Sequence, residues 1–232
     1  MEVTYVDHMG DDLRVVNAAR VSFNKESHWE TEFELVSDDG TLSNYTPVLS
    51  KGDQKLIQYL AKHNHWTPFS HVQITMREKV PIFVARQRFK HMVGFTYNEV
   101  SRRYVSDDPE FYVPDQWRKK AENKKQGSSE ETLLGDDAEW FDDKYTKLLA
   151  HVETLYKEMI EEGIAPEQAR MILPQSMYTE YYVTGSLAAW ARAYKLRVDP
   201  HAQLEIQELA KMWNENISGI KELEHSWKAL TQ

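Results

Sequence analysis

Residues 86–104 concentrate groups that could bind an anion, and they read RQRFKHMVGFTYNEVSRRY. Five fixed cations and four aromatic side chains share this stretch with a single acid, Glu99. An arginine guanidinium can hold a phosphate through two parallel hydrogen bonds, and a planar ring offers a surface for a flat base. The chain as a whole is acidic, with a formal net charge of −9, so overall composition does not account for these cations. We refer to residues 86–104 as the basic segment and expect it to bind a nucleotide.

The first half of the basic segment has the spacing of an amphipathic helix that begins near Ile82. Helical periodicity separates an apolar packing face from a polar face. The packing face comprises Ile82, Ala85, Phe89, Met92 and Val93, and the polar face comprises Gln87, Lys90 and His91. An ordinary surface helix with solvated cations would show the same pattern. Gly94 is expected to end the helix. The following FTYNEVSRRY places an acid, a hydroxyl and two guanidiniums within five residues, a density that is unusual for a solvent-facing loop.

Two other groups of side chains could do chemistry. Three histidines lie in HNHWTPFSH, and three imidazoles could hold zinc or iron: His63, His65 and His71. Pro68 lies between them and no helix carries two of them four residues apart, which counts against a metal site. Three arginines have apolar and aromatic neighbours: Arg170, Arg192 and Arg197. They either extend from a helix edge into solvent or are held in an anionic site, and the sequence leaves both open.

Length and composition limit the kind of protein. With 232 residues, 41% of them hydrophobic, the chain is long enough for one sizeable domain. Its acidity and its mean hydropathy of −0.66 argue against a general nucleic-acid or membrane-surface protein. No apolar run approaches a membrane span, and the first residues lack the features of a signal peptide, so we expect a cytoplasmic protein. Cysteine is absent, which excludes disulfides, thiolate metal sites and cysteine nucleophiles.

The elements that must position these groups follow from periodicity and from helix-ending residues. Strands are expected over residues 2–7 and 71–80, with a strand-to-helix junction at Pro81. Further helices are expected over residues 11–23, 52–62, 136–162, 166–172, 178–194 and from Pro200 to about residue 223. Residues 24–50 should form a loop or a long hairpin, and residues 106–135 a flexible surface loop.

Five blocks of sequence follow one another in a recognisable order. They are MGDD with AARVSF, then HWTPFSH, then PIFVARQ leading to NEVSRRY, then EQARMILPQSMYTEYY, and finally LRVDPHAQLEI. Together they resemble the flavin-dependent thymidylate synthases and span most of residues 1–210, leaving 24–50, 106–135 and the C-terminal end unmatched. The resemblance implies a single α/β (α+β) domain over residues 1–232. Its sheet would be central, mostly antiparallel and flanked by helices, with several long helices in the C-terminal half.

The resemblance also implies an activity, the reductive methylation of dUMP to dTMP. Methylenetetrahydrofolate would supply the carbon, and FAD reduced by NADPH would supply a hydride. Family members are typically homotetramers whose active sites are shared between subunits, which would explain why no single stretch here looks like a complete pocket. The unrelated cysteine-dependent thymidylate synthase attacks uracil with a thiolate, and this chain has none. Here the uracil must be activated electrostatically.

Matching the family's positions residue by residue implies a role for each site residue. Arg197 in LRVDPHAQ would be the catalytic residue, stabilising the anionic form of the uracil ring. Binding of dUMP would involve Gln87, Arg88, Lys90, Glu99, Ser101, Arg102, Arg103 and Arg170. Binding of FAD would involve His65, Thr67, Lys90, His91, Met92, Glu99, Ser186, Ala188 and Arg192. No adjacent base activates Ser101, so it is assigned to binding, and no metal ligand is implied.

The chain departs from the family pattern at several flavin positions. The usual Arg-His-Arg signature appears here as Lys90, His91 and Met92. The spacing from this signature to Ser101 is one residue longer than usual. Downstream, the expected asparagine, arginine and asparagine correspond to Ser186, Ala188 and Arg192. We hypothesise that Arg192, with Arg86 or Arg88, compensates for the lost guanidinium contacts to the FAD pyrophosphate.

Two other classes of protein remain open from the sequence. A single-stranded nucleic-acid-binding module could use the cations with Phe95, Tyr97 and Tyr104 as a stacking platform, although the rest of the chain is acidic. A metal-dependent nucleotide hydrolase could be built on the three histidines. Only a flavin-dependent synthase would bind FAD and release tritium from C5-labelled dUMP in the presence of NADPH and methylenetetrahydrofolate.

Overall fold

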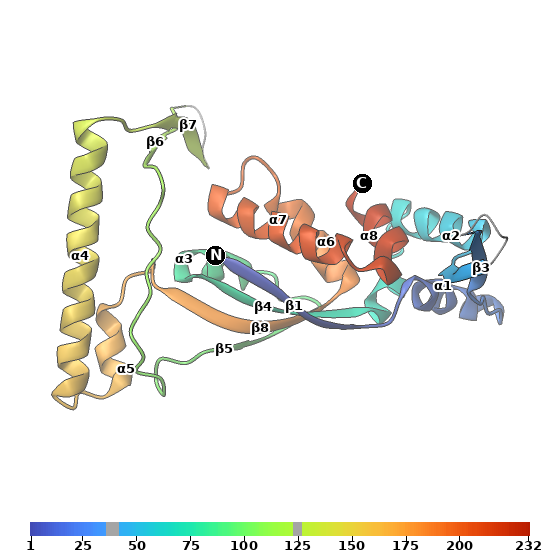
Figure 1. Ribbon diagram of the computed structural model, residues 1–232, viewed down its shortest axis with the longest axis horizontal. Coiled ribbons are helices and arrows are strands. Elements are labelled where there is room, and N and C mark those ends of the chain that lie inside the picture. The colour runs from blue at the N-terminus through green and yellow to red at the C-terminus, as the bar shows by residue number, and fades with distance from the viewer. Residues whose placement is uncertain (36–41, 123–126) are drawn as a thin grey trace.

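A four-stranded antiparallel sheet forms the centre of the chain, in the order β1-β4-β8-β5. Its strands are β1 (Glu2–Met9), β4 (Gln73–Pro81), β8 (Tyr178–Ser186) and β5 (Phe95–Glu99). The computed structural model describes residues 1–35, 42–122 and 127–232. Figure 1 shows helices packed over one face of this sheet. The expected α/β (α+β) class with a central antiparallel sheet is therefore confirmed.

Alternation along β4 and β8 turns one set of side chains into the core. Ile74 is fully buried, whereas Arg77 and Tyr182 are exposed on the other face. The buried face is covered by helices α3 (Ile82–Arg88), α6 (Leu187–Arg197), α7 (Leu204–Ser218) and α8 (Glu224–Thr231) (Figure 1). Trp190 of α6 and Trp213 of α7 meet edge to face in this core, with ring centroids 5.6 Å apart.

Strand β8 corrects the prediction of a helix over residues 178–194. Its buried residues recur at every second position, which is the period of a strand. Tyrosine, threonine and valine favour strands, and β8 pairs with both β4 and β5, so it is an inner strand of the sheet. The helix begins only at Leu187, after Ser186 has capped it. Sheet pairing therefore overrode the helical interpretation of this segment.

The N-terminal helices begin at capping residues. Helix α1 (Asp12–Arg20) follows Asp11, whose carboxylate accepts from the Arg14 backbone N–H at 2.7 Å. Helix α2 (Lys51–Lys62) follows Ser50, which caps it in the same way. Between them lie the turn η1 (Val21–Phe23) and the hairpin strands β2 (Glu30–Leu35) and β3 (Leu42–Val48). Residues 24–50 thus contain a hairpin, one of the two predicted forms, while residues 36–41 lie outside the described residues.

Helix α4 (Asp136–Glu161) lies at one end of the molecule, away from the sheet (Figure 1). The short helix α5 (Pro166–Ala169) and the turn η3 (Arg170–Ile172) pack beside it. These elements match the helices predicted over residues 136–162 and 166–172. Residues 106–135 include the paired strands β6 (Arg118–Lys120) and β7 (Ser128–Thr132) in place of an unbroken loop. Residues 123–126 of that predicted loop lie outside the described residues.

The basic segment differs from its prediction as a helix through Val93. Helix α3 ends at Arg88, and Met92 and Val93 are each 74% exposed instead of packed. Gly94 has φ of +81°, a left-handed conformation that turns the chain into strand β5. Pairing of β5 with β8 gives the backbone N–H and C=O groups partners within the sheet. The first half of FTYNEVSRRY is therefore an edge strand of the sheet.

The C-terminal helix predicted up to residue 223 is divided by the structure. Helix α7 ends at Ser218, and the turn η4 (Lys221–Leu223) leads into α8. Asp12 anchors α8, because its carboxylate accepts the backbone N–H groups of His225 and Ser226 at 2.9 Å each. Of the helices described, none combines the length and the apolar character that crossing a bilayer needs.

Candidate functional site

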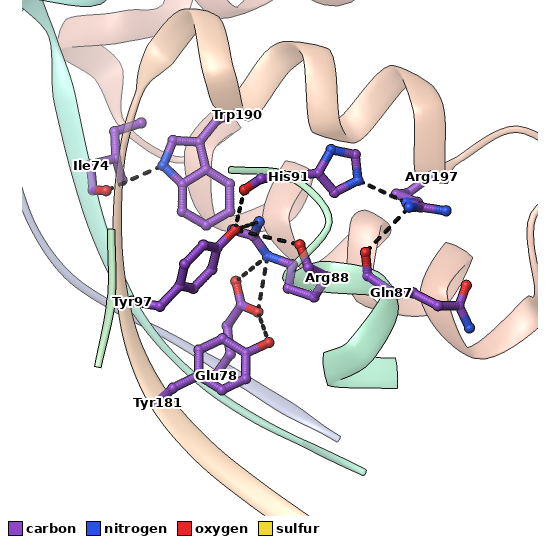
Figure 2. Close-up of polar contacts among 9 residues, drawn as sticks. All are labelled: Ile74, Glu78, Gln87, Arg88, His91, Tyr97, Tyr181, Trp190 and Arg197. Carbon is purple, nitrogen blue, oxygen red and sulfur yellow. Dashed lines mark hydrogen bonds and ion pairs between the residues drawn. The ribbon is translucent and has the colours of Figure 1, made fainter. Parts of the chain in front are cut away.

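Arg197, the last residue of α6, reaches two residues of the basic segment (Figure 2). Its Nε donates to His91 Nε2 at 2.8 Å, and its Nη2 donates to the Gln87 backbone carbonyl at 3.2 Å. Helix α6 follows β8 directly and runs back over the sheet (Figure 1). This return places its last residue at the end of α3. Three predicted site residues from two distant segments therefore lie together.

His91 is neutral in this arrangement. The residue is 8% exposed, and burial is the main cause that lowers its pKa to about 4, followed by the charges of Arg197, Arg88 and Arg192. A neutral imidazole that accepts at Nε2 carries its proton on Nδ1. Burial also lowers the pKa of Arg197, with the Arg88 charge as the second cause, although a guanidinium remains protonated at neutral pH. The Arg197 charge thus has an uncharged acceptor as its Nε partner.

Arg88 extends into the core and is fully buried (Figure 2). Its Nε lies 3.3 Å from the Glu78 carboxylate, which also accepts from the Tyr181 hydroxyl at 2.5 Å. Its Nη1 donates to the Tyr97 hydroxyl at 2.6 Å. The guanidinium carbon lies 4.3 to 4.8 Å from the ring centroids of Phe95, Trp190 and Trp213. Arg88 therefore holds α3 and β5 against the core, and its position gives no support to the predicted contact with dUMP.

A cavity of about 500 Å³ beside α6 brings three predicted flavin positions together. His65, Ala188 and Arg192 line it, and Trp66 and Leu196 contribute apolar surface. Thr67 follows in the sequence, immediately before the turn η2 (Pro68–His71), and is exposed. Aromatic and aliphatic walls with a cation suit a flat ring system that carries phosphate groups.

Lys195 lines the same cavity, one helical turn after Arg192. Lys195 was not among the predicted site residues, because it lies one residue beyond the helix predicted over residues 178–194. Arg192 also donates from Nη2 to the Val93 carbonyl, which ties α6 to the turn after α3. One face of α6 therefore carries two cations at the cavity.

Three other predicted flavin residues lie in different surroundings. Ser186 is 6% exposed, and its hydroxyl accepts from the Ala189 backbone N–H at 3.2 Å as the cap of α6. Gly94 packs against this cap so closely that a Cβ on it would lie 2.9 Å from the Ala189 Cβ. Met92 and Lys90 are both exposed at the end of α3. Ser186 thus fixes the turn, while Met92 and Lys90 present their side chains to solvent.

The remaining dUMP candidates gather at the other end of β5, near α4 and α5. Glu99 accepts from the Thr179 hydroxyl at 2.6 Å. Arg102 donates to the Asp107 carbonyl and lies 5.9 Å from the Tyr156 ring of α4. The other members of this group are Ser101, Arg103, which lies 3.7 Å from Glu167 of α5, and the exposed Arg170. Within the described part of the chain, no hydrogen bond or ion pair joins them to Gln87, His91 or Arg197.

The alternative sites considered from the sequence lack the required geometry. Phe95 and Tyr97 pack against Trp190 and Tyr181 in the core, so they are not a free stacking platform. Tyr104, by contrast, is 80% exposed. The ring centroids of His63 and His65 lie 6.4 Å apart, and the Tyr59 ring packs beside both of them. Residues 1–35, 42–122 and 127–232 contain no group of three or more metal-ligating side chains placed to hold an ion.

Gln87 continues into a chain of side-chain hydrogen bonds that the sequence analysis did not identify. Its Nε2 donates to Gln203 Oε1 at 2.7 Å, and Gln203 Nε2 donates to Glu205 Oε2 at 2.8 Å. Arg118 Nη2 of strand β6 donates to Glu205 Oε1 at 2.6 Å. The usable signal was the glutamate of DPHAQLEI, which precedes the core residue Ile206, since a buried acid must be paired.

Comparison with known proteins identifies a family for this architecture. A family model described as thymidylate synthase complementing protein matches residues 4–220. A flavin-dependent thymidylate synthase of Thermosipho africanus is 39% identical over 208 residues, which cover 88% of this chain and 80% of that protein. A flavin-dependent thymidylate synthase of Thermus thermophilus is 38% identical over 213 residues, which cover 90% of this chain and 68% of that protein.

Solved structures share the fold along the whole chain. The UMP/dUMP methylase PolB from Streptomyces cacaoi, bound with 5-Br UMP, has a TM-score of 0.77 at 27% identity. That match covers 99% of this chain and 93% of PolB. The same methylase bound with 5-Br dUMP gives a TM-score of 0.76 at 29% identity, covering 99% of this chain and 94% of PolB.

Proposed function

The chain belongs to the family of the flavin-dependent thymidylate synthases, and we propose that it makes dTMP by reductive methylation of dUMP. The observation that carries this proposal is the pairing of Arg197 with a neutral His91 beside Gln87. A strong cation without an acidic partner at its Nε suits a ring that becomes electron-rich during the reaction.

Arg197 stabilises the negative charge that develops on a uracil oxygen as the ring carbon C5 becomes nucleophilic. His91 holds the guanidinium in place through Nε and leaves the Arg197 charge uncompensated, because its pKa of about 4 keeps the imidazole neutral at pH 7. The chain has no cysteine that could add to the uracil ring. Charge stabilisation by Arg197 therefore takes the place of covalent activation.

The cavity beside α6 fits the flavin that the family requires. Trp66 and His65 offer ring surfaces, while Arg192 and Lys195 offer cations for a pyrophosphate. We propose FAD as this flavin. When bound, FAD reduced by NADPH supplies the hydride, and methylenetetrahydrofolate supplies the carbon. Leu196 adds an aliphatic contact for the ring system.

Arg192 compensates for guanidiniums that family members carry where this chain has Met92 and Ala188. Arg192 and Ala188 lie on the same cavity, and Arg192 already contacts the turn next to Met92 through the Val93 carbonyl. Lys195 adds a second cation there. The sequence suggested that either Arg86 or Arg88 assists Arg192 in binding the pyrophosphate. Arg88 is buried with Glu78, while Arg86 is exposed on α3. Arg86 is therefore the better candidate.

The active site is shared between copies of the chain in a homotetramer. Gln87 and Arg197 lie at one end of α6, whereas Ser101, Arg103 and Arg170 lie with α4 and α5. A second copy would complete each site with the group that the first copy holds elsewhere. Helix α4 leaves several large apolar side chains exposed for such an assembly: Trp140, Phe141 and Leu148.

A tritium-release assay tests the proposed function. The purified chain, loaded with FAD, is incubated with C5-tritiated dUMP, and each co-substrate is omitted in turn. Tritium release and dTMP formation should require both NADPH and methylenetetrahydrofolate. Protein that remains colourless with added FAD and releases no tritium would contradict the proposal. Size-exclusion chromatography with light scattering measures the assembly, and a monomer that is fully active would contradict the shared site.

A further inference from the structure

One chain of hydrogen bonds joins four side chains, and each bond in it has a fixed donor and acceptor: Gln87, Gln203, Glu205 and Arg118. Glu205 is 4% exposed and lies at 2.6 Å from the Arg118 guanidinium. A carboxylate in such an ion pair is ionised, so it can only accept hydrogen bonds. Gln203 must therefore present its NH₂ group to Glu205, and its carbonyl oxygen to Gln87. The structure has this arrangement. Gln203 Nε2 donates to Glu205 Oε2 at 2.8 Å, and Gln87 Nε2 donates to Gln203 Oε1 at 2.7 Å.

The orientation of Gln203 also fixes the orientation of the Gln87 amide. Since Gln203 offers Gln87 an acceptor, Gln87 must donate its own NH₂ group to it. The carbonyl oxygen Oε1 is then left for a ligand to donate to, whereas the NH₂ group is already engaged through one of its two N–H bonds. Within the described part of the chain, Oε1 of Gln87 accepts no hydrogen bond. Figure 2 shows Arg197 joined to the backbone carbonyl of Gln87, with the side-chain amide extending beyond that contact.

We propose that Gln203 and Glu205 are positioning residues that make Gln87 a hydrogen-bond acceptor toward the nucleotide. This inference rests on the proposed function and adds a specificity element to that site. A nucleoside monophosphate carries two kinds of donor, the N3–H of uracil and the sugar 3′-hydroxyl, whereas its ionised phosphate has none in the dianion. Gln87 therefore recognises a donor of the nucleoside part and not the phosphate.

Glu205 has a cation, Arg118, and a further acid, Glu208, among its neighbours. Glu208, an acid one turn further along the same helix, has a pKa raised by burial and next by the charge of Glu205, while Arg118 lowers it. Arg118 comes from strand β6, so the β6–β7 hairpin supplies the cation that pairs with Glu205.

Substitutions at positions 205 and 203 test the direction of the hydrogen bonds separately from the packing of these side chains. In Glu205→Gln, Arg118 still needs an acceptor, so the introduced amide turns its oxygen to Arg118 and its NH₂ to Gln203. Gln203 then reverses, and Gln87 presents NH₂ to the nucleotide. In the double variant Gln203→Glu with Glu205→Gln, the carboxylate at 203 accepts from both neighbours. Gln87 then donates its NH₂ group to position 203 and again presents its carbonyl oxygen to the nucleotide. The double variant contains the same two side chains as the wild type, with their positions exchanged.

The experiment measures Kd for dUMP on the FAD-loaded, full-length chain by calorimetry. Two analogues probe the two donors: N3-methyl-dUMP lacks the uracil N3–H, and 2′,3′-dideoxyuridine monophosphate lacks the 3′-hydroxyl. The wild type should bind one analogue about tenfold more weakly than dUMP. Glu205→Gln should weaken dUMP about tenfold and abolish the penalty of that analogue. The double variant should restore both values. Glu208→Gln, one turn further on α7, is the matched control and should behave as the wild type.

The outcomes distinguish the two proposals. If the wild type makes dTMP but Glu205→Gln keeps its dUMP affinity and the analogue penalty, the positioning role is wrong and the proposed function stands. A fall in melting temperature without a change in either Kd also rules out the positioning role, because it shows a structural role only. If the wild type neither binds dUMP nor makes dTMP, both proposals fail.

Discussion

Arg197 donates its Nε proton to Nε2 of a neutral His91 across 2.8 Å. The more usual acceptor for a guanidinium is a carboxylate, which would neutralise the charge. A buried imidazole fixes the geometry of Arg197 and leaves its charge for the ligand. Burial first, and the neighbouring Arg197 charge second, lower the pKa of His91 and keep it unprotonated at neutral pH.

Loss of Arg197 should separate the two halves of the reaction. In Arg197→Ala, methylation of dUMP should fall by about a hundredfold or more, because the cation opposite the developing charge is gone. Flavin reduction by NADPH, followed by the bleaching of flavin absorbance, should remain largely intact. Arg197→Lys keeps the positive charge but loses the forked geometry of the guanidinium. Its methylation rate should lie between those of the wild type and Arg197→Ala. Equal loss of both half-reactions would instead indicate a structural role.

The pKa of His91 predicts a pH-dependent stability. In the fold this pKa falls from 6.5 to about 4, so between these values the unfolded chain binds a proton that the folded chain does not. The stability contribution is full above about pH 6.5 and is lost as the pH falls toward 4, by up to about 3 kcal/mol.

His91→Gln tests this dependence, because glutamine can still accept from Arg197 but does not titrate. Urea denaturation of the wild type and the variant at pH 7 and pH 4.5 should show a smaller loss of stability in the variant. The same loss in both proteins would mean that His91 does not carry the effect.

Arg88 should be essential for the core and not for the nucleotide. Arg88→Met leaves Glu78 buried without its ion-pair partner and should destabilise the fold by about 3–5 kcal/mol. The exposed neighbour Arg86 serves as the control, since Arg86→Met should change stability by less than about 0.5 kcal/mol. Chemical denaturation gives both values. A stable Arg88→Met protein that has lost dUMP binding would restore the nucleotide contact predicted from the sequence.

Arg192 and Lys195 should contribute separately to flavin affinity. Arg192→Ala removes a cation from the cavity and the contact with the Val93 carbonyl, so FAD should bind about tenfold or more weakly. Lys195→Ala removes a cation alone and should have a smaller effect. Fluorescence titration of the apoprotein with FAD measures both. Unchanged affinity in Arg192→Ala would disprove the compensation for Met92 and Ala188.

Gly94→Ala should disturb the turn that joins His91 to β5. Its φ of +81° disfavours any side chain, and an added Cβ would meet the Ala189 Cβ at 2.9 Å. We expect a loss of about 1–3 kcal/mol in unfolding free energy. Gly163→Ala is a useful comparison, because Gly163 has φ of +79° but nothing within 4 Å of the added Cβ. If the two variants were equally destabilised, the contact with α6 would contribute nothing.

Local signals were sufficient where an element is defined by its own residues. The Asp11 cap, the period of α4 and its end at Gly163 depend on neighbours within a turn or two, and the structure has them as predicted. Residues 178–186 were assigned wrongly, since their preference for a strand depends on β4 and β5, which lie far away in the chain. The helix expected through Val93 ends at Arg88 instead, and the turn at Gly94 then leads into β5, whose partner β8 is also distant in the chain.

The sequence by itself determined the family, the need for electrostatic activation without cysteine, and most of the residues that carry charge. These follow from residue identity and order, which are local properties. Only the tertiary structure decided where each charge lies. It buried Arg88 with Glu78, set Arg197 beside His91, and connected Gln87 to Glu205. Such pairings join segments that are distant along the chain, and they depend on how helices return over the sheet, which no local pattern encodes.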